Sequence, residues 1–360
     1  MVTYGSVSRD PVVTGIGCIS SLGCATKTMI DRLLASDTGI RRIDTFDTSP
    51  LQAKRAARIS GFDPSAHIAP AKLRRIDAVG RVAIAATKMA LEDAGIDAGT
   101  RGDRIGLVLG TTTAGVHTTA EYLESLMRGG PTGAPALLFA NTVGNAAASL
   151  CGIEFGLRGP NTTLSHKEAS GLAALAYARD LVRLGRAQAV VSGGADDIYE
   201  RFFLVHDWFG VLSRDGEFPE GSRPFDRTRN GFVMGEGGFM CVLEDAEAAD
   251  ARGARTYGAL LGVGARGSNE AVNAWPTKVD ALADTMREAL QDARRTPADV
   301  GAVYASANST RELDLTHWGV EMARKGGVPA DRVLNCLTLQ QITRHFSRRS
   351  RSNCIRDLFP

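Results

Sequence analysis

The sequence predicts a layered α/β fold built from two copies of one strand–helix–strand unit, with mostly parallel sheets covered by helices. Two apolar runs with a helical stretch between them occur near the N-terminus, and the same order occurs again after residue 250. The two helical stretches also end alike, with Ala-Leu-Glu-Asp-Ala at 90–94 and Ala-Leu-Gln-Asp-Ala at 289–293. The shared order and the shared ending favour duplication over chance similarity between common α/β segments.

The first copy begins with the apolar run 12–17, which is broken by glycines and predicts a buried strand. Residues 71–94 have the helical period, and Gly95 is typical of a helix end. Residues 105–110 predict a second buried strand. The apolar face of the helical stretch carries Leu73, Ile76, Val79, Ala83, Ala86, Ala90 and Leu91.

The second copy has the same three parts. Residues 258–264 predict a strand, residues 279–293 a helix, and residues 300–305 a further strand. Alternation of strands and helices in both copies favours parallel strands with helices on both faces of each sheet.

The composition is that of a globular chain with a sizeable core. The chain has 360 residues, of which 44% are hydrophobic, and its net charge of +2 gives no charge excess that would indicate a nucleic-acid partner. We find no signal-peptide pattern at the N-terminus and no apolar run long enough to span a membrane, so we expect a cytoplasmic protein. The six cysteines are far apart and predict reduced core residues: Cys18, Cys24, Cys151, Cys241, Cys336 and Cys354.

Residues 160–185 predict a strand-to-helix turn of the kind that presents a nucleophile. A Thr-rich strand leads into a turn and then into a helix that opens with the small residues of 169–178. The N-terminus of such a helix offers free N–H groups and the positive end of a dipole, which lower the pKa of a thiol and stabilise an oxyanion.

The turn at 160–172 resembles the one that carries the nucleophilic cysteine in β-ketoacyl synthases, the condensing enzymes of fatty-acid and polyketide assembly. Gly-Gly-Ala-Asp at 193–196 and the long segment 222–238 resemble the same family, and the similarity covers residues 10–315. The resemblance implies a thiolase-like fold, with duplicated α/β/α/β/α layers and mostly parallel mixed sheets. It implies neither a cofactor nor a metal. The long segment is expected to form a buried charged hairpin beside the turn.

Two positions depart from the catalytic Cys, His and His of the family. Glu168 stands where the resemblance places the nucleophilic cysteine, and a carboxylate cannot hold an acyl chain as a stable thioester. Ser306 stands at the first histidine, in a register anchored by Ser309, Thr310 and Asp314. A serine is neutral at pH 7 and cannot replace imidazole as an acid or base.

The second histidine of the family is assigned to His345, with Gln340 at the lysine position of the family. A surface histidine is the alternative, because the surrounding similarity is thin. His166 lies close to Glu168 in the sequence, although a turn residue that points elsewhere is the simpler interpretation. The histidines show no metal-ligand spacing.

The resemblance divides the chain into an N-terminal ketosynthase half at 10–250, a C-terminal half at 251–343 and a basic divergent tail at 344–360. The second half is predicted to be incomplete, because nothing matches the Gly-Phe-Gly-Gly loop of the family. Natural truncation, a frameshift and completion by a partner are all compatible with this end. The tail is interpreted as a solvated or artefactual end; a flexible segment for an anionic partner is the alternative.

The paired departures at Glu168 and Ser306 favour a non-condensing subunit that resembles the chain length factor of type II polyketide systems. Such a subunit pairs with a catalytic ketosynthase, or with itself, and contacts acyl carrier protein. No membrane or nucleic-acid partner is expected.

Three alternatives stay open. A malonyl-carrier-protein decarboxylase would supply starter units, although an anionic Glu168 would repel the malonyl carboxylate. A condensing enzyme with another nucleophile would have to use Cys18 or Cys151, which lie in segments typical of a core. The last alternative is a non-functional remnant or scaffold.

Overall fold

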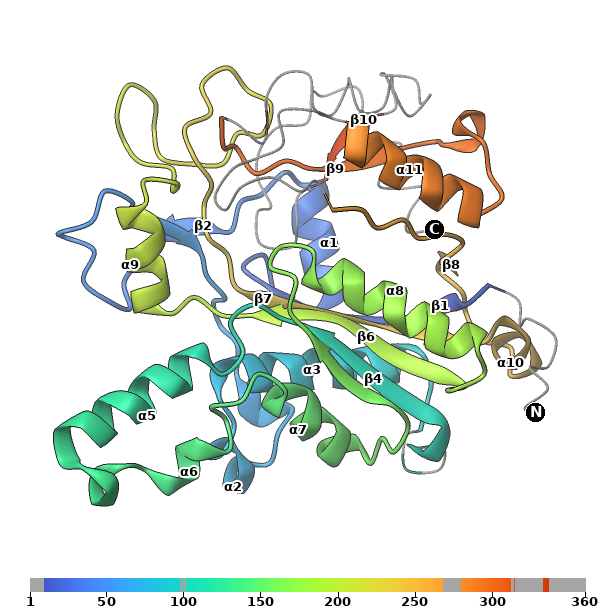
Figure 1. Ribbon diagram of the computed structural model, residues 1–360, viewed down its shortest axis with the longest axis horizontal. Helices are drawn as coiled ribbons and strands as arrows, with labels where there is room; N and C mark the ends of the chain where they lie inside the picture. The colour runs from blue at the N-terminus through green and yellow to red at the C-terminus, as the bar shows by residue number, and fades with distance from the viewer. Residues whose placement is uncertain are drawn as a thin grey trace.

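The computed structural model describes residues 10–97, 99, 102–267, 280–311 and 314, and only the backbone of residues 305, 306 and 333–336. Its centre is a six-stranded sheet in the order β5-β4-β6-β7-β1-β8 (Figure 1). These strands are β1 (Val12–Ser20), β4 (Ile105–Gly110), β5 (Asn161–Leu164), β6 (Ala189–Asp196), β7 (Gly237–Glu244) and β8 (Gly258–Ala259). Strands β5, β4 and β6 are parallel, whereas β7 runs antiparallel to both β6 and β1.

Two small sheets accompany the large one. The first pairs β2 (Ile40–Arg42) with β3 (Arg55–Ala57), and the second pairs β9 (Val303–Ser306) with β10 (Val333–Cys336) in parallel. The described helices are α1 (Thr26–Leu34), α2 (Pro70–Leu73), α3 (Ala78–Asp93), α5 (Val116–Gly129), α6 (Ala136–Phe139), α7 (Ala146–Phe155), α8 (Ser170–Arg183), α9 (Glu200–Trp208), α10 (Ala246–Ala251) and α11 (Asp280–Asp292). Four short 3-10 helices are η1 (Pro64–Ala66), η2 (Gly102–Arg104), η3 (Pro131–Gly133) and η4 (Pro297–Asp299).

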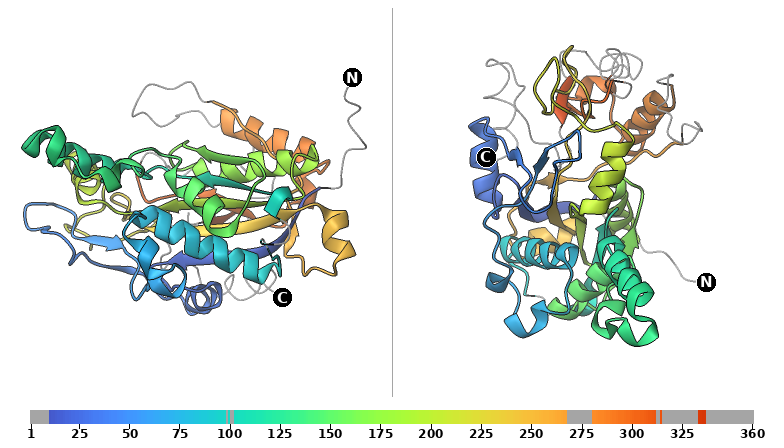
Figure 2. Two further views of the ribbon diagram at one scale, coloured as in Figure 1. Left: turned by 90° about the horizontal axis from the view of Figure 1, so that it is seen from below. Right: turned by 90° about the vertical axis from the view of Figure 1, so that its left-hand side faces the viewer.

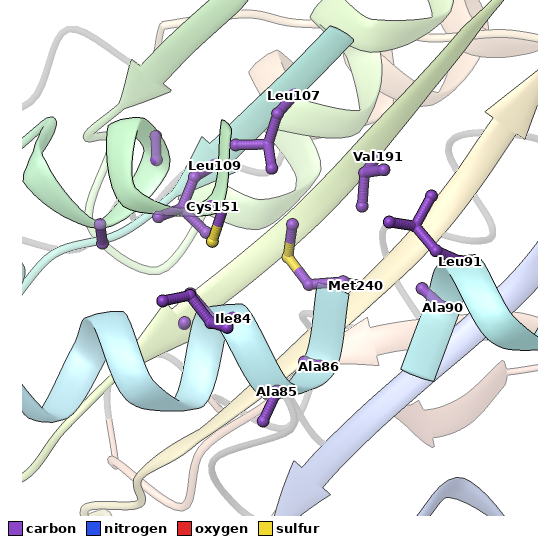
Figure 3. Close-up of a cluster of buried hydrophobic side chains, with 14 of the residues drawn as sticks. Ile84, Ala85, Ala86, Ala90, Leu91, Leu107, Leu109, Cys151, Val191 and Met240 are labelled. Carbon is purple, nitrogen blue, oxygen red and sulfur yellow. The ribbon is translucent and has the colours of Figure 1, made fainter. Parts of the chain in front are cut away.

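Alternating side chains of the strands build one core on each face of the sheet. Leu107 and Leu109 of β4 face α3 and α7, whereas Val108 between them faces α8. Figure 3 shows the first core, where Ile84 and Ala86 of α3 lie across from the strands. Figure 2 shows the sheet between α3 and α8. The layered α/β prediction, with a mostly parallel mixed sheet, is therefore confirmed.

The prediction of a single helix over residues 71–94 is wrong in one respect. The chain forms α2 and then, after a break, α3 begins at Ala78. Asp77 has extended backbone angles, and its carboxylate accepts the N–H of Gly80 at 2.8 Å. The aspartate therefore caps a new helix instead of continuing the old one.

The duplication is visible in matching contacts between a pair of glycines and a helix. In the first copy, Gly15 and Gly17 lie against α3, where a Cβ would come within 2.2 and 2.0 Å of helix carbonyl oxygens. In the second copy, Gly262 and Gly264 lie against α11 with corresponding distances of 2.2 and 2.1 Å. Only glycine permits such close backbone approach. The predicted strand at 258–264 is shorter than expected, because only Gly258–Ala259 pair with β1.

A repeated aspartate fixes each helix to the segment that carries these glycines. Asp93, the last residue of α3, accepts the N–H of Ile16 at 2.9 Å. Asp292, the last residue of α11, accepts the N–H of Val263 at 3.0 Å. The shared Asp-Ala helix ending in the sequence therefore has a common structural role in both copies.

Arg179 of α8 ties the second copy to the first half of the chain. Its guanidinium lies 2.6 Å from the carboxylate of Asp292 and donates to the carbonyl oxygen of Leu261 at 3.0 Å. The arginine side chain is only 4% exposed, whereas that of Asp292 is 33% exposed. The ion pair therefore has one buried and one half-buried member.

We expect Arg179→Gln to lower the free energy of unfolding by about 2 kcal/mol, because a partly buried ion pair loses one member. Urea unfolding followed by circular dichroism measures the change. Arg183→Gln is the matched control, since Arg183 reaches the same carboxylate at 3.5 Å from a more exposed position. Arg183→Gln should lower the free energy of unfolding by less than about 1 kcal/mol. Equal effects of the two substitutions would contradict the assigned role.

Candidate functional site: the turn between β5 and α8

The turn between β5 and α8 is held by one serine. Ser170, the first residue of α8, accepts the N–H of His166 at 2.8 Å and donates its hydroxyl to the carbonyl oxygen of Lys167 at 2.6 Å. Lys167 between them has a φ of 50°, in the left-handed region that non-glycine residues rarely adopt. The buried hydroxyl of Ser170 therefore stabilises the sharp turn before α8.

Close backbone contact brings α8 against the sheet. A Cβ on Gly110, at the end of β4, would lie 2.3 Å from both the carbonyl carbon and the oxygen of Ser170. A Cβ on Gly194 of β6 would lie 3.6 Å from the Cα of Gly171. Small residues at these places let the N-terminus of α8 sit directly on the carboxyl ends of β4 and β6.

Glu168 lies on this turn, two residues before α8 begins. Its side chain is exposed, and within the described residues its carboxylate makes no hydrogen bond or ion pair. The N–H groups of Ala169 and Ser170 are already taken by the carbonyl oxygens of His166 and Lys167, at 3.1 and 3.0 Å. Among the described residues the turn therefore presents this carboxylate without a partner, and the side chain of His166 beside it is also exposed.

A half-buried aspartate fixes the neighbouring loop. One oxygen of Asp196 accepts the hydroxyls of Thr111 and Thr113 and the N–H groups of Thr112 and Thr113, at 2.7 to 3.0 Å. Burial raises the pKa of Asp196, and these four donors oppose that rise. The hydroxyl of Ser170 also lies 3.4 Å from the carbonyl oxygen of Thr111, so the loop and the turn support each other. The threonine run after the predicted strand at 105–110 was the signal for this loop, and sequence reasoning missed it.

The segment around Ser306 is anchored from its far end. Asp314 is fully buried and accepts the N–H groups of Asn308, Ser309 and Phe225 at 2.8 to 3.0 Å. Burial raises the pKa of Asp314, while these N–H groups act against the rise. Ser309 in turn contacts Ser222 through its hydroxyl at 3.2 Å. The two positions that anchor the sequence register, Ser309 and Asp314, thus tie this segment to the long motif.

The long motif at 222–238 does not form the expected hairpin. Its residues form a series of turns that lead into β7. Glu236, near its end, is 8% exposed and accepts the N–H groups of Ile59 and Ile198 at 2.9 and 3.1 Å. Backbone N–H groups from distant segments thus pair with Glu236, which holds the loops around it together.

The three assigned positions have different outcomes. Glu168 lies at the edge of the six-stranded sheet, whereas the backbone of Ser306 belongs to the separate sheet of β9 and β10. His345 lies outside the described residues, as does Gln340. No hydrogen-bonded sheet joins Glu168 to Ser306 in the described part of the chain.

The buried cysteines are unsuited to nucleophilic attack. Cys18 and Cys151 are fully buried, and burial raises the pKa of each thiol to about 12. The same holds for Cys241. A thiol is reactive as its thiolate, so at neutral pH these three residues are core side chains, as their apolar segments predict.

Comparison with known proteins identifies the family. A family model described as the N-terminal domain of β-ketoacyl synthase matches residues 9–249. The chain belongs to the β-ketoacyl synthase family. This is a family of fatty-acid and polyketide biosynthesis, and the predicted resemblance is confirmed.

Relatives in this family match most of the chain. It is 32% identical over 312 residues to 3-oxoacyl-(acyl-carrier-protein) synthase 2 of Vibrio cholerae, a match that covers 85% of this chain and 75% of that protein. The corresponding protein of Staphylococcus aureus is 30% identical over 312 residues, covering 86% and 75%.

Solved structures of ketosynthases share the fold. The ishigamide ketosynthase/chain length factor superposes with a TM-score of 0.81 at 30% identity, over 92% of this chain and 81% of that one. A β-ketoacyl synthase from Burkholderia phymatum gives a TM-score of 0.78 at 26% identity, over 88% and 77%. In the described ranges of our chain, no helix combines the length and apolar character that crossing a bilayer requires.

Proposed function

We propose that this chain is a non-condensing ketosynthase-fold subunit that acts like a chain length factor beside a catalytic ketosynthase. The observation that carries the proposal is Glu168 on the turn between β5 and α8, where the family resemblance calls for a cysteine. Condensation needs an acyl chain held as a thioester on that residue, and a carboxylate cannot form one. Ser306 at the first histidine position removes the imidazole as well.

No other described thiol replaces the missing nucleophile. The pKa of Cys18, Cys151 and Cys241 lies near 12, and each is buried away from the turn in a hydrophobic core. Cys24 is half-buried, and burial raises its pKa too. A condensing enzyme built on one of these four thiols is therefore not supported.

A strand with one unpaired edge and a nearby exposed apolar side chain support a partner subunit. Within the described residues, β5 is an edge strand that pairs only with β4. Ile153 of α7, beside β5, is 77% exposed, and it lines a hollow with Arg158 and Asn161. Edge strands and exposed apolar residues are typical of surfaces that pair with another chain. The similarity to the ishigamide ketosynthase/chain length factor favours a ketosynthase as that chain.

The remaining parts of the proposal follow from the family. Acyl carrier protein is the expected second partner, because it delivers acyl chains to ketosynthases. The division into a ketosynthase half at 10–250, an incomplete second half at 251–343 and a tail at 344–360 belongs to the same proposal, as does a cytoplasmic location.

The turn offers little support for decarboxylation. A decarboxylase needs hydrogen-bond donors for a developing enolate. The N–H groups of Ala169 and Ser170 are occupied within the turn, and the exposed carboxylate of Glu168 adds negative charge beside any malonyl group. We therefore treat carbon-dioxide release from malonyl-carrier protein as an outcome of the test and not as a second proposal.

The test is co-expression with a cysteine-bearing type II ketosynthase and its carrier protein. We expect the two subunits to co-purify and the pair to make a product of defined length, while each subunit alone makes none. Ile153→Asp should reduce co-purification at least tenfold, since it places a charge in an apolar interface. Leu184→Asp, at an exposed leucine after α8, is the matched control and should leave it unchanged.

Two results would contradict the proposal. Failure to bind any such ketosynthase would exclude the chain-length-factor role and leave the hypothesis of a scaffold or a non-functional remnant. Carbon-dioxide release by the isolated chain above background would instead assign a decarboxylase.

A further inference from the structure

Helices α5 and α6 form an arm that leaves the body of the protein. The arm, defined as residues 116–139, includes α5, η3 and α6, and Figure 1 shows it beyond the end of the sheet. Tyr122 and Phe139 hold its two helices together, with ring centroids 5.7 Å apart. The exposed apolar side chains of the arm are Val116, Leu123, Met127, Leu137 and Phe139. The position of the arm therefore decides where a sizeable apolar surface lies.

One histidine at the base of the arm contacts the body. His117, in the first turn of α5, stacks on Tyr199, with ring centroids 4.2 Å apart and an interplanar angle of 17°. Its Nδ1 lies 3.7 Å from a carboxylate oxygen of Asp197, which directly follows β6. Its Nε2 lies 3.1 Å from Glu121, one turn further along α5. The imidazole thus has a carboxylate at each nitrogen.

The body surrounds this histidine with negative charge. Asp197 is 9% exposed, and its Oδ1 has no hydrogen-bond partner among the described residues. Asp77, which caps α3, is near enough to interact with both Asp197 and His117. Two acidic groups of the body therefore lie near the imidazole, and its protonated form places a positive charge beside them.

We propose that His117 is a pH-sensitive latch that holds the arm on the body when the imidazole is protonated. The neighbouring carboxylate of Asp197 is the main cause that raises the pKa of His117, and Glu121 adds to it. A pKa raised above its ordinary 6.5 means that docking stability is fully present below pH 6.5. That stability is lost as the pH rises through the raised value.

The geometry favours a latch over a catalytic or metal-binding role. Both imidazole nitrogens face carboxylates, so neither is free to exchange a proton with a substrate. Within the residues that the structure describes, no three side chains of the kinds that bind metals are grouped to hold an ion. The inference does not depend on the proposed function of the turn.

The test is hydrogen exchange of the α5 amides, expressed as protection relative to an unstructured chain at the same pH. Between pH 6 and pH 9 we expect the protection of residues 118–129 to fall. The fall should be about tenfold for each unit by which the pKa of His117, titrated by NMR in the same protein, exceeds 6.5. Amides of α3 in the core should not share this fall, which separates arm opening from global unfolding.

Three variants sharpen the test. His117→Gln should make the protection of α5 independent of pH, and Asp197→Asn should reduce the change. His67→Gln is the matched control, because burial lowers the pKa of His67 on a different part of the surface. It should behave as the unmodified protein does.

Two outcomes would overturn the proposal. One is a titrated pKa of His117 at or below 6.5, which needs no variant to fold. The other is a pH-dependent loss of α5 protection that persists unchanged in His117→Gln.

Discussion

Glu168→Cys is expected to create a reactive thiol that the unmodified protein lacks. The new thiol would lie on an exposed turn at the N-terminus of α8, where the helix dipole lowers a thiol pKa below its usual 8.5. The four described native thiols are buried or half-buried, and the pKa of each is raised. Iodoacetamide should therefore modify the variant stoichiometrically while those four thiols react slowly.

The rate of alkylation against pH measures the pKa of the new thiol. Ser165→Cys is the matched control, since Ser165 is also exposed but precedes the turn. At pH 7, the thiol at 168 should react about threefold faster than the thiol at 165 for each unit by which its pKa is the lower of the two. The reason is that the thiolate population rises more than the nucleophilicity of the thiolate falls. Equal rates at the two positions would show that the turn does not activate a nucleophile.

Acyl transfer gives a second measure with the same variant. We expect Glu168→Cys to accept an acyl group from an acyl thioester, because this step needs only an activated thiol at the helix N-terminus. Condensation should stay absent, since Ser306 supplies no imidazole. Mass spectrometry of the intact protein detects the acyl adduct. Condensation by the single variant would contradict the assignment of Ser306.

Gly110→Ala is expected to lower the free energy of unfolding by about 3 kcal/mol or more. The added methyl group would meet the backbone of Ser170 at 2.3 Å and that of Gly171 at 2.6 Å, and neither can move without shifting α8. A loss of this size is a large part of the roughly 10 kcal/mol that stabilises a typical protein. Urea unfolding measures it directly.

Gly129→Ala is the matched control for this substitution. Gly129 is the last residue of α5, and a Cβ there would meet no atom within 4 Å. This substitution should be neutral or stabilise the protein by up to about 1 kcal/mol, because alanine restricts the unfolded chain. If Gly110→Ala were tolerated as well as Gly129→Ala, the close approach of α8 to β4 would not be a constraint on the fold.

The sequence by itself was sufficient to predict the repeated unit and the family. Helix period and the shared Asp-Ala ending depend on neighbouring residues, so residues 90–94 and 289–293 could be matched without coordinates. The turn at Glu168 was also found from local signals, because a Thr-rich strand followed by small residues is a property of one short segment.

Only the tertiary structure determined the contacts that connect distant segments. Asp196 gathers four donors from the threonine loop, and Arg179 reaches Asp292 across 113 positions of the chain (292 − 179). The break before α3 also needed coordinates, because the apolar period continues through it although Asp77 caps a new helix. His117 showed no role in the sequence, since its partners Asp197 and Tyr199 lie about 80 residues away (197 − 117 = 80). Local patterns fix which elements form, whereas side-chain partners depend on how those elements pack.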